Sequence, residues 1–389
     1  MRKVALVGAG VSRFGVRKAT YRDLIWEAGK ACFDSAPGVR PRDLEGLVVG
    51  SVMPERTAFQ SHISSLAAEA LGIRPSALSA RTEHMCASGT VGIRYAYAFI
   101  AAGLADLVMV LGVEKLNQPR ADEAILNMGT GVDREWEAAF GLTAPPCFAL
   151  AAQRHMAAYG TTEEQLALVG VKNHTHASKN PNAHFNKGAT LDQVLCSRMI
   201  ASPLRLFMCS PITDGAAAVI LAGEERARAL TDRPVWIRGS GQALDGFQLT
   251  SLHEDYAHWP AMKRAADAAY RAAGIGPRDV DVAEVHDCFS IAELIAYEEL
   301  GFCAKGEAGP FVAAGRSDYG GDVVVNPRGG LIGCGHPLGA TGVAQAAEIF
   351  VQLRGEAGAR QVPDAAIALT HNNSGMGEHI VVVYGKEPA

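Results

Sequence analysis

The sequence has no CxxC pair, no excess of charge of one sign and no long hydrophobic run. The eight cysteines stand far apart, at Cys32, Cys86, Cys147, Cys196, Cys209, Cys288, Cys303 and Cys334. This spacing argues against zinc ribbons, iron–sulfur clusters and disulfide frameworks, and favours free thiols in a reducing compartment. The net charge of −5 gives no electrostatic reason to bind nucleic acid. No uncharged apolar stretch reaches about 18 residues, so no membrane span is expected.

The chain also lacks the features of a targeting signal and of a dinucleotide fingerprint. Its N-terminus, MRKVALVGAG, has a brief apolar stretch that ends in glycines, which is typical of a first strand. The C-terminal KEPA is no peroxisomal signal. Arg13 stands where GxGxxG needs its third glycine, so nicotinamide chemistry is not predicted. We expect a soluble cytoplasmic enzyme.

Glycine, by contrast, is abundant, and most of the 42 glycines lie between short apolar runs. Runs such as Val4–Val7 and Leu107–Leu111 are typical of buried strands, and helical patterns such as Val91–Ala102 lie between them. A second series of the same kind extends from Val235–Arg238 to Ile380–Tyr384. Strands that alternate with helices of this length predict an α/β architecture.

The two series resemble copies of one unit. GVRPRDLEGLVVG at 38–50 aligns with GIGPRDVDVAEVH at 274–286, and each half has a glycine-rich turn before a helix. We predict an internal duplication with halves 1–232 and 233–389. An insertion at about 120–200 in the first half is rich in His, Asn and Pro, and we expect a loop-like excursion that carries binding function.

Cys86 is the first candidate for chemistry. It lies in HMCASG, directly before an apolar helical stretch. At a helix N-terminus, unpaired N–H groups and the helix dipole favour a thiolate and can stabilise an oxyanion. The alternative is a buried structural thiol.

Histidines at other glycine-punctuated turns are the second set of candidates. His336 lies in GCGHPLGATG, where a stiff turn would hold an imidazole able to activate a thiol. His286 in HDCF and His371 in HNNSGMG follow apolar strands, and open α/β sheets place their chemistry at such strand ends. We predict that these groups, with Cys86 and Cys288, converge on an active site; the alternative is that the histidines belong to the core.

A metal site is not predicted. His174, His176 and His184 include an HxH pair, but no acidic or thiolate partner stands nearby at ligand spacing. We expect these three side chains on a loop surface.

Six segments together resemble thiolases, in particular the SCP2-type and archaeal-type branch. They are CASG at 86–89, DGAAAVIL at 214–221, HDCF at 286–289, NPRGG at 326–330, GHPLGATG at 335–342 and HNNSGMG at 371–377. The similarity runs over essentially the whole chain. It implies two duplicated mixed-sheet halves stacked as α-β-α-β-α layers, with an inserted loop domain.

The resemblance also implies roles for the candidates. Cys86 matches the nucleophile that takes the acyl group from acyl-CoA, and His336 would activate it and bind the thioester oxygen of the incoming nucleophile. His286 stands where the best-known thiolases have an Asn and would build the same oxyanion hole. The backbone N–H of Cys86 and the backbone at Asn373, Ser374 and Gly375 would form a second hole.

One position departs from the best-known thiolases, which have a catalytic Cys where this chain has His371. In the SCP2-like branch the Cys of HDCF takes over, so Cys288 becomes the acid/base and His371 its neighbour. A base for a proton α to a thioester needs a pKa near the working pH, and we expect the surrounding imidazoles to lower the pKa of this thiol.

The implied activity is that of an acyl-CoA C-acyltransferase, which makes or cleaves the C–C bond of a 3-ketoacyl-CoA. CoA and acyl-CoA would be substrates, with no permanently bound cofactor or metal. We expect a homodimer or tetramer that buries an edge strand of the first half. The resemblance also implies that several members of this branch work with a small zinc-ribbon/OB-fold partner, and such a partner stays open for this chain. Contacts to CoA are expected in the insertion and around 240–258. The acyl pocket is expected to be lined by Met128, Trp136, Phe140, Phe148 and Phe185.

Two further functions stay open. A thiolase-fold retro-aldolase, or a C-acyltransferase for a non-CoA acceptor, is the first. The retro-aldol relatives dispense with the nucleophilic Cys, as the resemblance has it, whereas Cys86 is present here. A non-catalytic acyl-CoA or lipid-binding protein is the second, and it leaves the joint presence of Cys86, Cys288, His286 and His336 unexplained.

Overall fold

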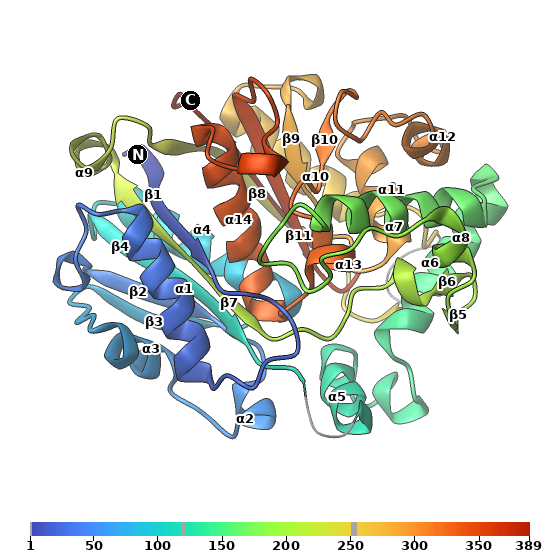
Figure 1. Ribbon diagram of the computed structural model, residues 1–389, viewed down its shortest axis with the longest axis horizontal. Coiled ribbons are helices and arrows are strands. Elements are labelled where there is room, and N and C mark those ends of the chain that lie inside the picture. The colour runs from blue at the N-terminus through green and yellow to red at the C-terminus, as the bar shows by residue number, and fades with distance from the viewer. Residues whose placement is uncertain (1, 118–120, 250–254) are drawn as a thin grey trace.

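The computed structural model describes residues 2–117, 121–249 and 255–389 (Figure 1). Residue 120, where the predicted insertion begins, and residues 250–254, inside the segment expected to contact CoA, lie outside the described residues. Within the described ranges, no helix is both long enough and apolar enough to cross a membrane.

The N-terminal part of the chain supplies five strands of a large mixed sheet. They are β1 (Val4–Val11), β2 (Gly46–Gly50), β3 (Leu78–Thr82), β4 (Leu107–Glu114) and β7 (Gly215–Gly223). Their order is β3-β2-β4-β7-β1, in which β3, β2 and β4 are parallel and β7 is antiparallel to both its neighbours. Strands β4 and β7 are buried along their whole length, as their continuous apolar sequences predict.

The C-terminal part repeats this arrangement. Its strands are β8 (Val235–Leu244), β9 (Val282–Glu284), β10 (Val324–Val325), β11 (Ile367–Ser374) and β12 (Glu378–Gly385). Their order is β10-β9-β11-β12-β8, so each strand has a counterpart at the same place in the first series. The two series join where Ala5 and Leu6 of β1 pair with Trp236 and Val235 of β8. The division at 232/233 stays a prediction.

Helices form three layers around the two series of strands (Figure 1). Helices α1 (Tyr21–Ser35) and α3 (Ile63–Leu71) pack on one outer face. Helices α4 (Ser88–Ala101) and α14 (Leu338–Arg354) fill the space between the two series. On the other outer face lies α10 (Pro260–Ala273), with α11 (Ser290–Glu299) beside it. These are the predicted α-β-α-β-α layers, and the fold class is confirmed.

The insertion is mainly helical, so the expectation of a loop-like excursion is wrong. Its helices are α5 (Ala121–Met128), α6 (Ala144–Tyr159), α7 (Glu163–Ala177) and α8 (Leu191–Leu195). Helix α7 begins at a capping box between Thr162 and Gln165. Its inner face carries polar residues such as Lys172 and Asn173 beside apolar ones, and these buried polar side chains hide the apolar periodicity. The remaining short elements are α2 (Pro54–Thr57), β5 (Met199–Ala201), β6 (Leu204–Arg205), α9 (Glu224–Leu230), α12 (Ala308–Ala313) and α13 (Gly330–Cys334).

Glycines allow the central layer to bring the two halves close together. A Cβ atom on Gly89, at the start of α4, would lie 2.6 Å from the carbonyl oxygen of Gly339 at the start of α14. A Cβ atom on Gly112 of β4 would lie 2.4 Å from the same oxygen. Side chains at these positions would push the halves apart. This approach holds the Cys86 turn against the His336 turn.

Candidate active site

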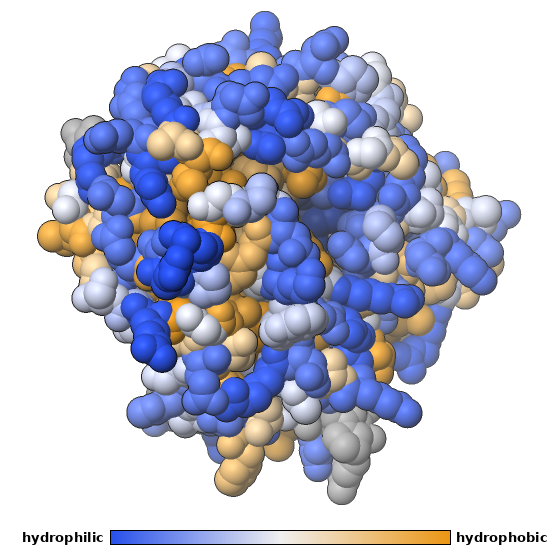
Figure 2. Space-filling view, turned by 60° about the vertical axis from the view of Figure 1, so that its left-hand side comes forward, coloured by the Kyte–Doolittle hydropathy of each residue, from blue (hydrophilic) through white to orange (hydrophobic). Residues whose placement is uncertain are grey.

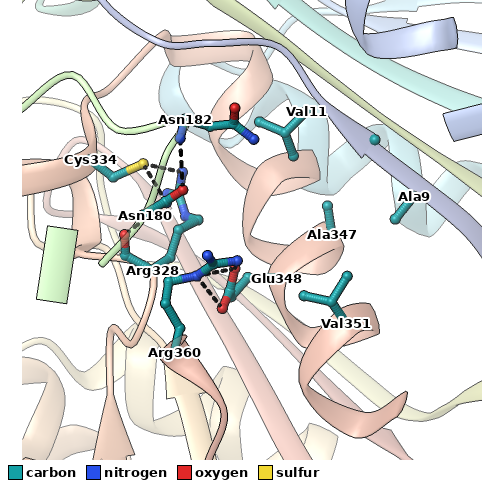
Figure 3. A pocket seen from close by; sticks show the side chains of 11 residues that line it. Ala9, Val11, Asn180, Asn182, Arg328, Cys334, Ala347, Glu348, Val351 and Arg360 are labelled. Atoms are coloured by element: carbon teal, nitrogen blue, oxygen red, sulfur yellow. Dashed lines mark hydrogen bonds and ion pairs between the residues drawn. The ribbon is translucent and has the colours of Figure 1, made fainter. Parts of the chain in front are cut away.

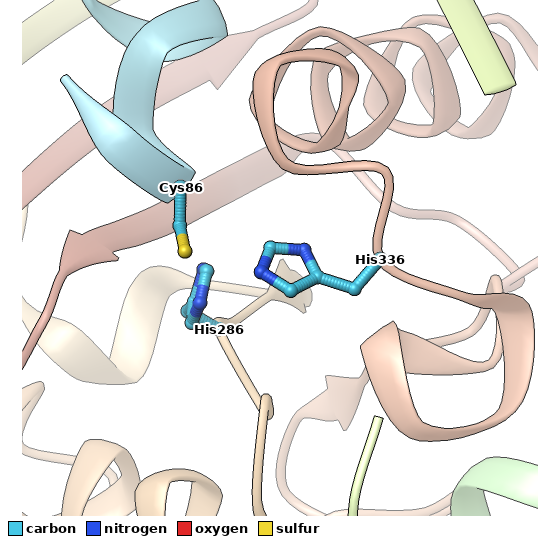
Figure 4. Close-up of side chains that lie close together, drawn as sticks. All are labelled: Cys86, His286 and His336. Atoms are coloured by element: carbon cyan, nitrogen blue, oxygen red, sulfur yellow. The ribbon is translucent and has the colours of Figure 1, made fainter. Parts of the chain in front are cut away.

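Cys86, His286 and His336 meet at the junction of the two halves (Figure 4). One sulfur or nitrogen atom from each side chain lies within 4.8 Å of the others. Cys86 comes from a 3₁₀ turn (Met85–Ala87) before α4, His286 from the loop after β9, and His336 from the turn before α14. Three segments distant in sequence thus place a thiol and two imidazoles together.

The turn that carries Cys86 is fixed by one hydroxyl. Ser88 Oγ accepts a hydrogen bond from the His84 backbone N–H (2.7 Å) and donates one to the Met85 carbonyl (2.6 Å). Met85 has a φ of +43°, in the left-handed region, so the chain bends sharply before the nucleophile. Cys86 therefore stands on a strained turn, two residues before α4 begins at Ser88.

Cys86 rests as a thiol and not as the thiolate that its place before a helix predicts. Burial raises the pKa of the Cys86 thiol to about 12, and the carboxylate of Glu114 acts in the same direction. A backbone hydrogen bond lowers this pKa, but its effect is smaller than that of burial. Hence a base must take the proton when the sulfur attacks.

His336 has the geometry of that base. Its Nδ1 lies 2.7 Å from Thr341 Oγ1, and the preceding Gly335 has a φ of +106° that places the ring at this turn. Nε2 is buried and makes no hydrogen bond within the described part of the chain. Burial lowers the pKa of His336 to about 3, and the positive charge of Arg328 adds to this effect. The ring is neutral, with Nε2 facing Cys86 (Figure 4).

His286 completes the cluster. Its ring stands edge-on to that of His336, with the centroids 5.0 Å apart and the planes at 87°. Nδ1 of His286 is buried and has no hydrogen-bond partner among the described residues. Burial, and then the neighbouring imidazoles, hold the pKa of His286 well below its usual range. The free nitrogen of His286 can donate to a developing oxyanion when it carries the ring proton, and Nε2 of His336 can do so once it has taken the proton of Cys86.

Cys288 lies two residues after His286 and is buried. Its carbonyl oxygen accepts a hydrogen bond from the backbone N–H of Ser210 (2.9 Å). Burial, followed by interaction with Cys86, raises the pKa of Cys288 well above its usual value. The expectation of a lowered pKa is therefore wrong for the resting enzyme, because neutral imidazoles cannot stabilise a thiolate by charge.

His371 lies on β11 behind the loop that carries His286. Its Nδ1 accepts the His286 backbone N–H at 3.5 Å, and its Nε2 lies 3.1 Å from Nδ1 of His379. Nε2 of His379 in turn lies 2.9 Å from the carbonyl oxygen of Met376. Burial lowers the pKa of both rings, to about 4 for His379. His379, which sequence reasoning did not single out, lies on β12 and carries no motif that would have revealed it.

Asn373, Ser374 and Gly375 lie at the end of β11 and in the turn that follows. Strand β11 packs beside the 3₁₀ turn of Cys86. The Asn373 side chain hydrogen-bonds to the Gly375 carbonyl, and Gly375 has a φ of +61°. Strand β11, which ends with Asn373 and Ser374, thus lies next to the nucleophile turn, and the oxyanion role of this backbone stays a prediction.

The expectation of a loop surface is wrong for His174 and His176, whereas His184 lies in a loop and is half-buried. His174 and His176 lie on the buried face of α7. Nε2 of His176 is 2.8 Å from Asp318 Oδ1, and Nδ1 of His184 is 3.0 Å from Thr213 Oγ1. Among the described residues, the one His/Cys/Asp/Glu group with a geometry suited to a metal ion is the Cys86 cluster itself.

The aromatic side chains expected in an acyl pocket differ in their surroundings, and the pocket itself stays a prediction. Trp136 and Phe140 are 72% and 80% exposed, and Phe148 is buried in the core, where its ring stacks on Phe289. Of the expected residues, Met128 does pack against the apolar cluster that contacts Cys86. The members of this cluster are Val52, Met53, Leu116 and Leu338, and Met85 also packs against it. The apolar surroundings of the nucleophile are therefore rich in methionine.

A separate cavity of about 150 Å³ lies between β1 and α14 (Figure 3). Arg328 and Cys334 line it, with Arg328 Nη1 3.2 Å from Cys334 Sγ, and Arg360 pairs with Glu348 beside them. The side chains that line this cavity do not include the Cys86 cluster. Its link to the site is electrostatic, because the Arg328 charge helps to keep His336 neutral.

The sequence matches two family models that span most of the chain. "Thiolase, N-terminal domain" matches residues 4–225, and "Thiolase C-terminal domain-like" matches residues 241–386. The chain belongs to the thiolase family. It is 46% identical to an acetyl-CoA acetyltransferase of Methanothermobacter thermautotrophicus, with 97% of each chain covered. It is 38% identical to bovine sterol carrier protein 2, with 98% of this chain and 72% of that protein covered.

Solved structures share the fold of this chain. A structure named "Ltp2-ChsH2(DUF35) aldolase" has a TM-score of 0.85 at 28% identity and covers 99% of this chain and 98% of its own. Human mitochondrial 3-ketoacyl-CoA thiolase in complex with CoA has a TM-score of 0.75 at 19% identity, over 99% of this chain and 98% of its own, and supports the fold. The thiolase is an enzyme, an acyltransferase with coenzyme A thioesters as substrates.

Proposed function

We propose that this thiolase makes or cleaves the C–C bond of a 3-ketoacyl-CoA through an acyl thioester on Cys86. The observation that supports this most directly is the meeting of the Cys86 thiol with His336 and His286 within 4.8 Å. Both imidazoles are neutral, since burial lowers the pKa of each. A neutral base beside a neutral thiol suits attack on an uncharged thioester carbonyl.

In the first half-reaction, Nε2 of His336 takes the proton of Cys86 while the sulfur attacks the thioester carbonyl of acyl-CoA. Backbone donors at Cys86 and near Asn373 to Gly375 hold the oxyanion, and the bond to the CoA sulfur breaks. The CoA thiolate leaves with the proton of Cys288. The positive charge now on His336 favours the Cys288 thiolate, because an opposite charge in a low-dielectric site stabilises it.

In the second half-reaction, the Cys288 thiolate takes the α-proton of a second acyl-CoA. His336 and His286 hold the enolate oxygen, and the α-carbon attacks the thioester carbonyl on Cys86. The Cys86 sulfur leaves and recovers its proton from His336, so each group returns to its resting state. The raised resting pKa of Cys288 makes its thiolate a strong base for this step.

Intact-protein mass after incubation with acetyl-CoA tests the proposal. We expect an acetyl adduct on the wild type and on Cys209→Ala, a matched thiol control, and none on Cys86→Ala. Cys288→Ala should keep the adduct but lose turnover. His336→Ala should lower turnover by about 10² to 10³, the cost of one oxyanion donor. A folded wild type that forms no adduct with any acyl-CoA contradicts the mechanism.

A retro-aldolase is the second candidate. The structural likeness to a protein named an aldolase, at a TM-score of 0.85, favours it. The presence of Cys86 argues for acyl transfer instead. Release of an aldehyde or ketone from a β-hydroxyacyl-CoA, without an adduct on Cys86, would establish the aldolase activity. If the adduct forms, 3-ketoacyl-CoA substrates of increasing length then sort the acyl-chain preference.

The proposal includes a homodimer or tetramer that covers strand β3. Among the described strands, β3 is an edge strand with β2 as its one neighbour in the sheet. The side of the molecule that Figure 2 brings forward carries a broad hydrophobic area. Phe59, which precedes α3, is 97% exposed in the single chain. A second copy would cover such an edge and such side chains. Light scattering tests this, and a monomer mass contradicts it.

A partner polypeptide and a compartment complete the proposal. The aldolase structure's name joins two names, one of them marked DUF35, and we infer a small zinc-ribbon/OB-fold partner for this chain.

Because all eight cysteines are free, the cytoplasm is the proposed location. We retain 1–232 and 233–389 as the two thiolase halves. Co-purification tests the partner, and limited proteolysis tests the division into halves.

A further inference from the structure

Asp287 stands between His286 and Cys288, but its carboxylate is bound away from the Cys86 cluster. Oδ1 accepts the backbone N–H of Leu331 at 2.6 Å, and Oδ2 accepts that of Ile332 at 3.2 Å. Both donors belong to α13, which ends at Cys334, two residues before His336. One fully buried carboxylate therefore ties the loop of His286 and Cys288 to the helix that leads to His336.

The glycines of the NPRGG segment make room for this carboxylate. A Cβ atom on Gly330 would lie 2.2 Å from Asp287 Oδ2, closer than any side chain tolerates. Gly330 also has a φ of +57° and Gly329 a φ of +108°, which other residues rarely adopt. The second glycine of this motif is thus explained by the carboxylate that it faces.

Helix α7 of the insertion supports the same carboxylate. The side-chain nitrogen of Asn173 donates to Asp287 Oδ2 (2.7 Å) and to Glu293 Oε2 (2.6 Å). Lys172 Nζ lies 2.9 Å from Glu293 Oε1, and Asn326 also donates to Glu293. Buried networks whose members are all bonded are rigid and hold their parts in one arrangement.

We propose that Asp287 is a positioning residue that sets the placement of His286 and Cys288 relative to His336. This inference rests on the proposed function. Asp287 acts through the backbone and does not touch the reacting groups. His336 has a second anchor in Thr341, whereas the loop of residues 286–288 depends on Asp287 for its attachment to α13.

The two half-reactions should therefore respond differently to the loss of this carboxylate. In acylation the new bond is formed by Cys86 and His336, which Ser88 and Thr341 continue to hold, and Cys288 only gives its proton to the departing CoA. The C–C bond step also needs Cys288 and His286 in place. Asp287→Asn removes one acceptor oxygen and sets an NH₂ group against backbone donors, so the loop should shift. We expect kcat to fall about 10- to 100-fold, the range seen for residues that orient the ligands of a catalytic metal. The rate of Cys86 acetylation should change less than about threefold.

Asp281→Asn is the matched control. Asp281 lies before β9, at the other end of the strand from His286, and its Oδ2 accepts two consecutive backbone N–H groups, those of Ala366 (2.8 Å) and Ile367 (2.9 Å). The same chemical change is thus made at a similar carboxylate outside the site. The measurements are the thermal midpoint, the single-turnover acetylation rate of Cys86 by mass, and steady-state kcat and KM for thiolysis of acetoacetyl-CoA.

The inference is supported if Asp287→Asn lowers kcat more than it lowers the acetylation rate of Cys86, and if Asp281→Asn leaves kcat unchanged. Equal turnover of the two variants, or parallel losses of acetylation, turnover and thermal midpoint, overturns it. If Asp287→Asn does not fold, Asn173→Ser is the variant to test, because it removes the side-chain donor that hydrogen-bonds to the carboxylate. We expect kcat to fall more than the acetylation rate in this variant too, but by a smaller factor. Absence of an adduct in the wild type instead overturns the proposed function and, with it, the roles that Asp287 would support.

Discussion

Thr341 Oγ1 lies 2.7 Å from Nδ1 of His336, and this contact leaves Nε2 as the ring nitrogen that faces Cys86. The Thr341 side chain is fully buried on α14, so it holds the ring from a rigid element. Of the two neutral tautomers, the one with its proton on Nδ1 can donate to Thr341 and keep a lone pair on Nε2. This is the form of His336 that can accept the Cys86 proton, and the hydroxyl holds its ring in place.

Replacement of Thr341 by valine should slow acetylation of Cys86 by up to about tenfold, the worth of one hydrogen bond. Valine has nearly the same shape, so the fold should be kept. Thr341→Ser restores the hydroxyl and should restore most of the rate. The measurement is the single-turnover mass assay, with thermal midpoints of all three proteins as the control. Equal rates for the valine and serine variants would contradict a role for this contact.

Several buried strands and helix α4 of the central layer could be predicted from the sequence, because strands buried on both faces have unbroken apolar sequences. The predicted strands Val4–Val7 and Leu107–Leu111 lie within the longer strands β1 and β4. Strand β3 was missed, since LSART alternates small and polar residues at an exposed edge. Helix α7 was missed because Lys172, Asn173 and His176 point inward to make hydrogen bonds, and polar residues on a buried face remove the helical hydrophobic pattern.

The meeting of Cys86, His286 and His336 could be predicted, because each stands at a glycine-punctuated turn next to a buried element. Their protonation states could not, because burial is a property of the folded chain. A helix N-terminus favours a thiolate, but here the enclosure of Cys86 outweighs it. Asp287 and Thr341 were also beyond sequence reasoning, since nothing in a sequence shows which backbone N–H or ring nitrogen a side chain meets.

Alkylation of Cys86 should report a thiol and not a thiolate–imidazolium pair. Because burial raises the pKa of Cys86 to about 12, the reactive thiolate fraction should grow about tenfold for each pH unit through the neutral range. The rate of iodoacetamide labelling at Cys86, followed by peptide mass between about pH 6 and pH 9, should rise without a plateau. Levelling near neutral pH would mean a preformed ion pair with His336. Cys86→Ala identifies the labelled peptide.

The ion pair between His84 and Glu378 should stabilise the fold in a defined pH window. Nε2 of His84 lies 2.5 Å from Glu378 Oε2 and joins the nucleophile turn to β12. The hydrogen bond to Glu378 raises the pKa of His84 above its usual 6.5, so this stabilisation is complete below 6.5 and is lost as pH rises through the raised value. Burial opposes the shift at Glu378, but its hydrogen bonds hold the pKa below 4.5, and its contribution is lost as pH falls through the lowered value.

The pair should therefore contribute fully between 4.5 and 6.5. His84→Gln should lower the thermal midpoint at about pH 6, and its effect should shrink toward about pH 9, because the wild-type imidazole loses its proton as pH rises through its raised pKa. The partly exposed His258, which pairs with Glu299, offers a matched control in His258→Gln. An effect of His84→Gln that is the same at both pH values would rule out the ion pair as its cause.

Zinc should inhibit the enzyme at the Cys86 cluster. A thiolate sulfur and imidazole nitrogens bind Zn²⁺ at about 2.0 to 2.3 Å, and ligand atoms within 4.8 Å of one another reach such distances after small side-chain rotations. Cys86 must release its proton to the solvent, so inhibition should strengthen as pH rises. Prior acetylation of Cys86 removes the sulfur ligand and should protect the enzyme, and EDTA should restore the activity of the unacylated form. The wild type should bind one more equivalent of zinc than Cys86→Ala, measured by metal analysis after gel filtration. Equal zinc content of the two proteins, or inhibition that acetylation does not relieve, would place the metal elsewhere.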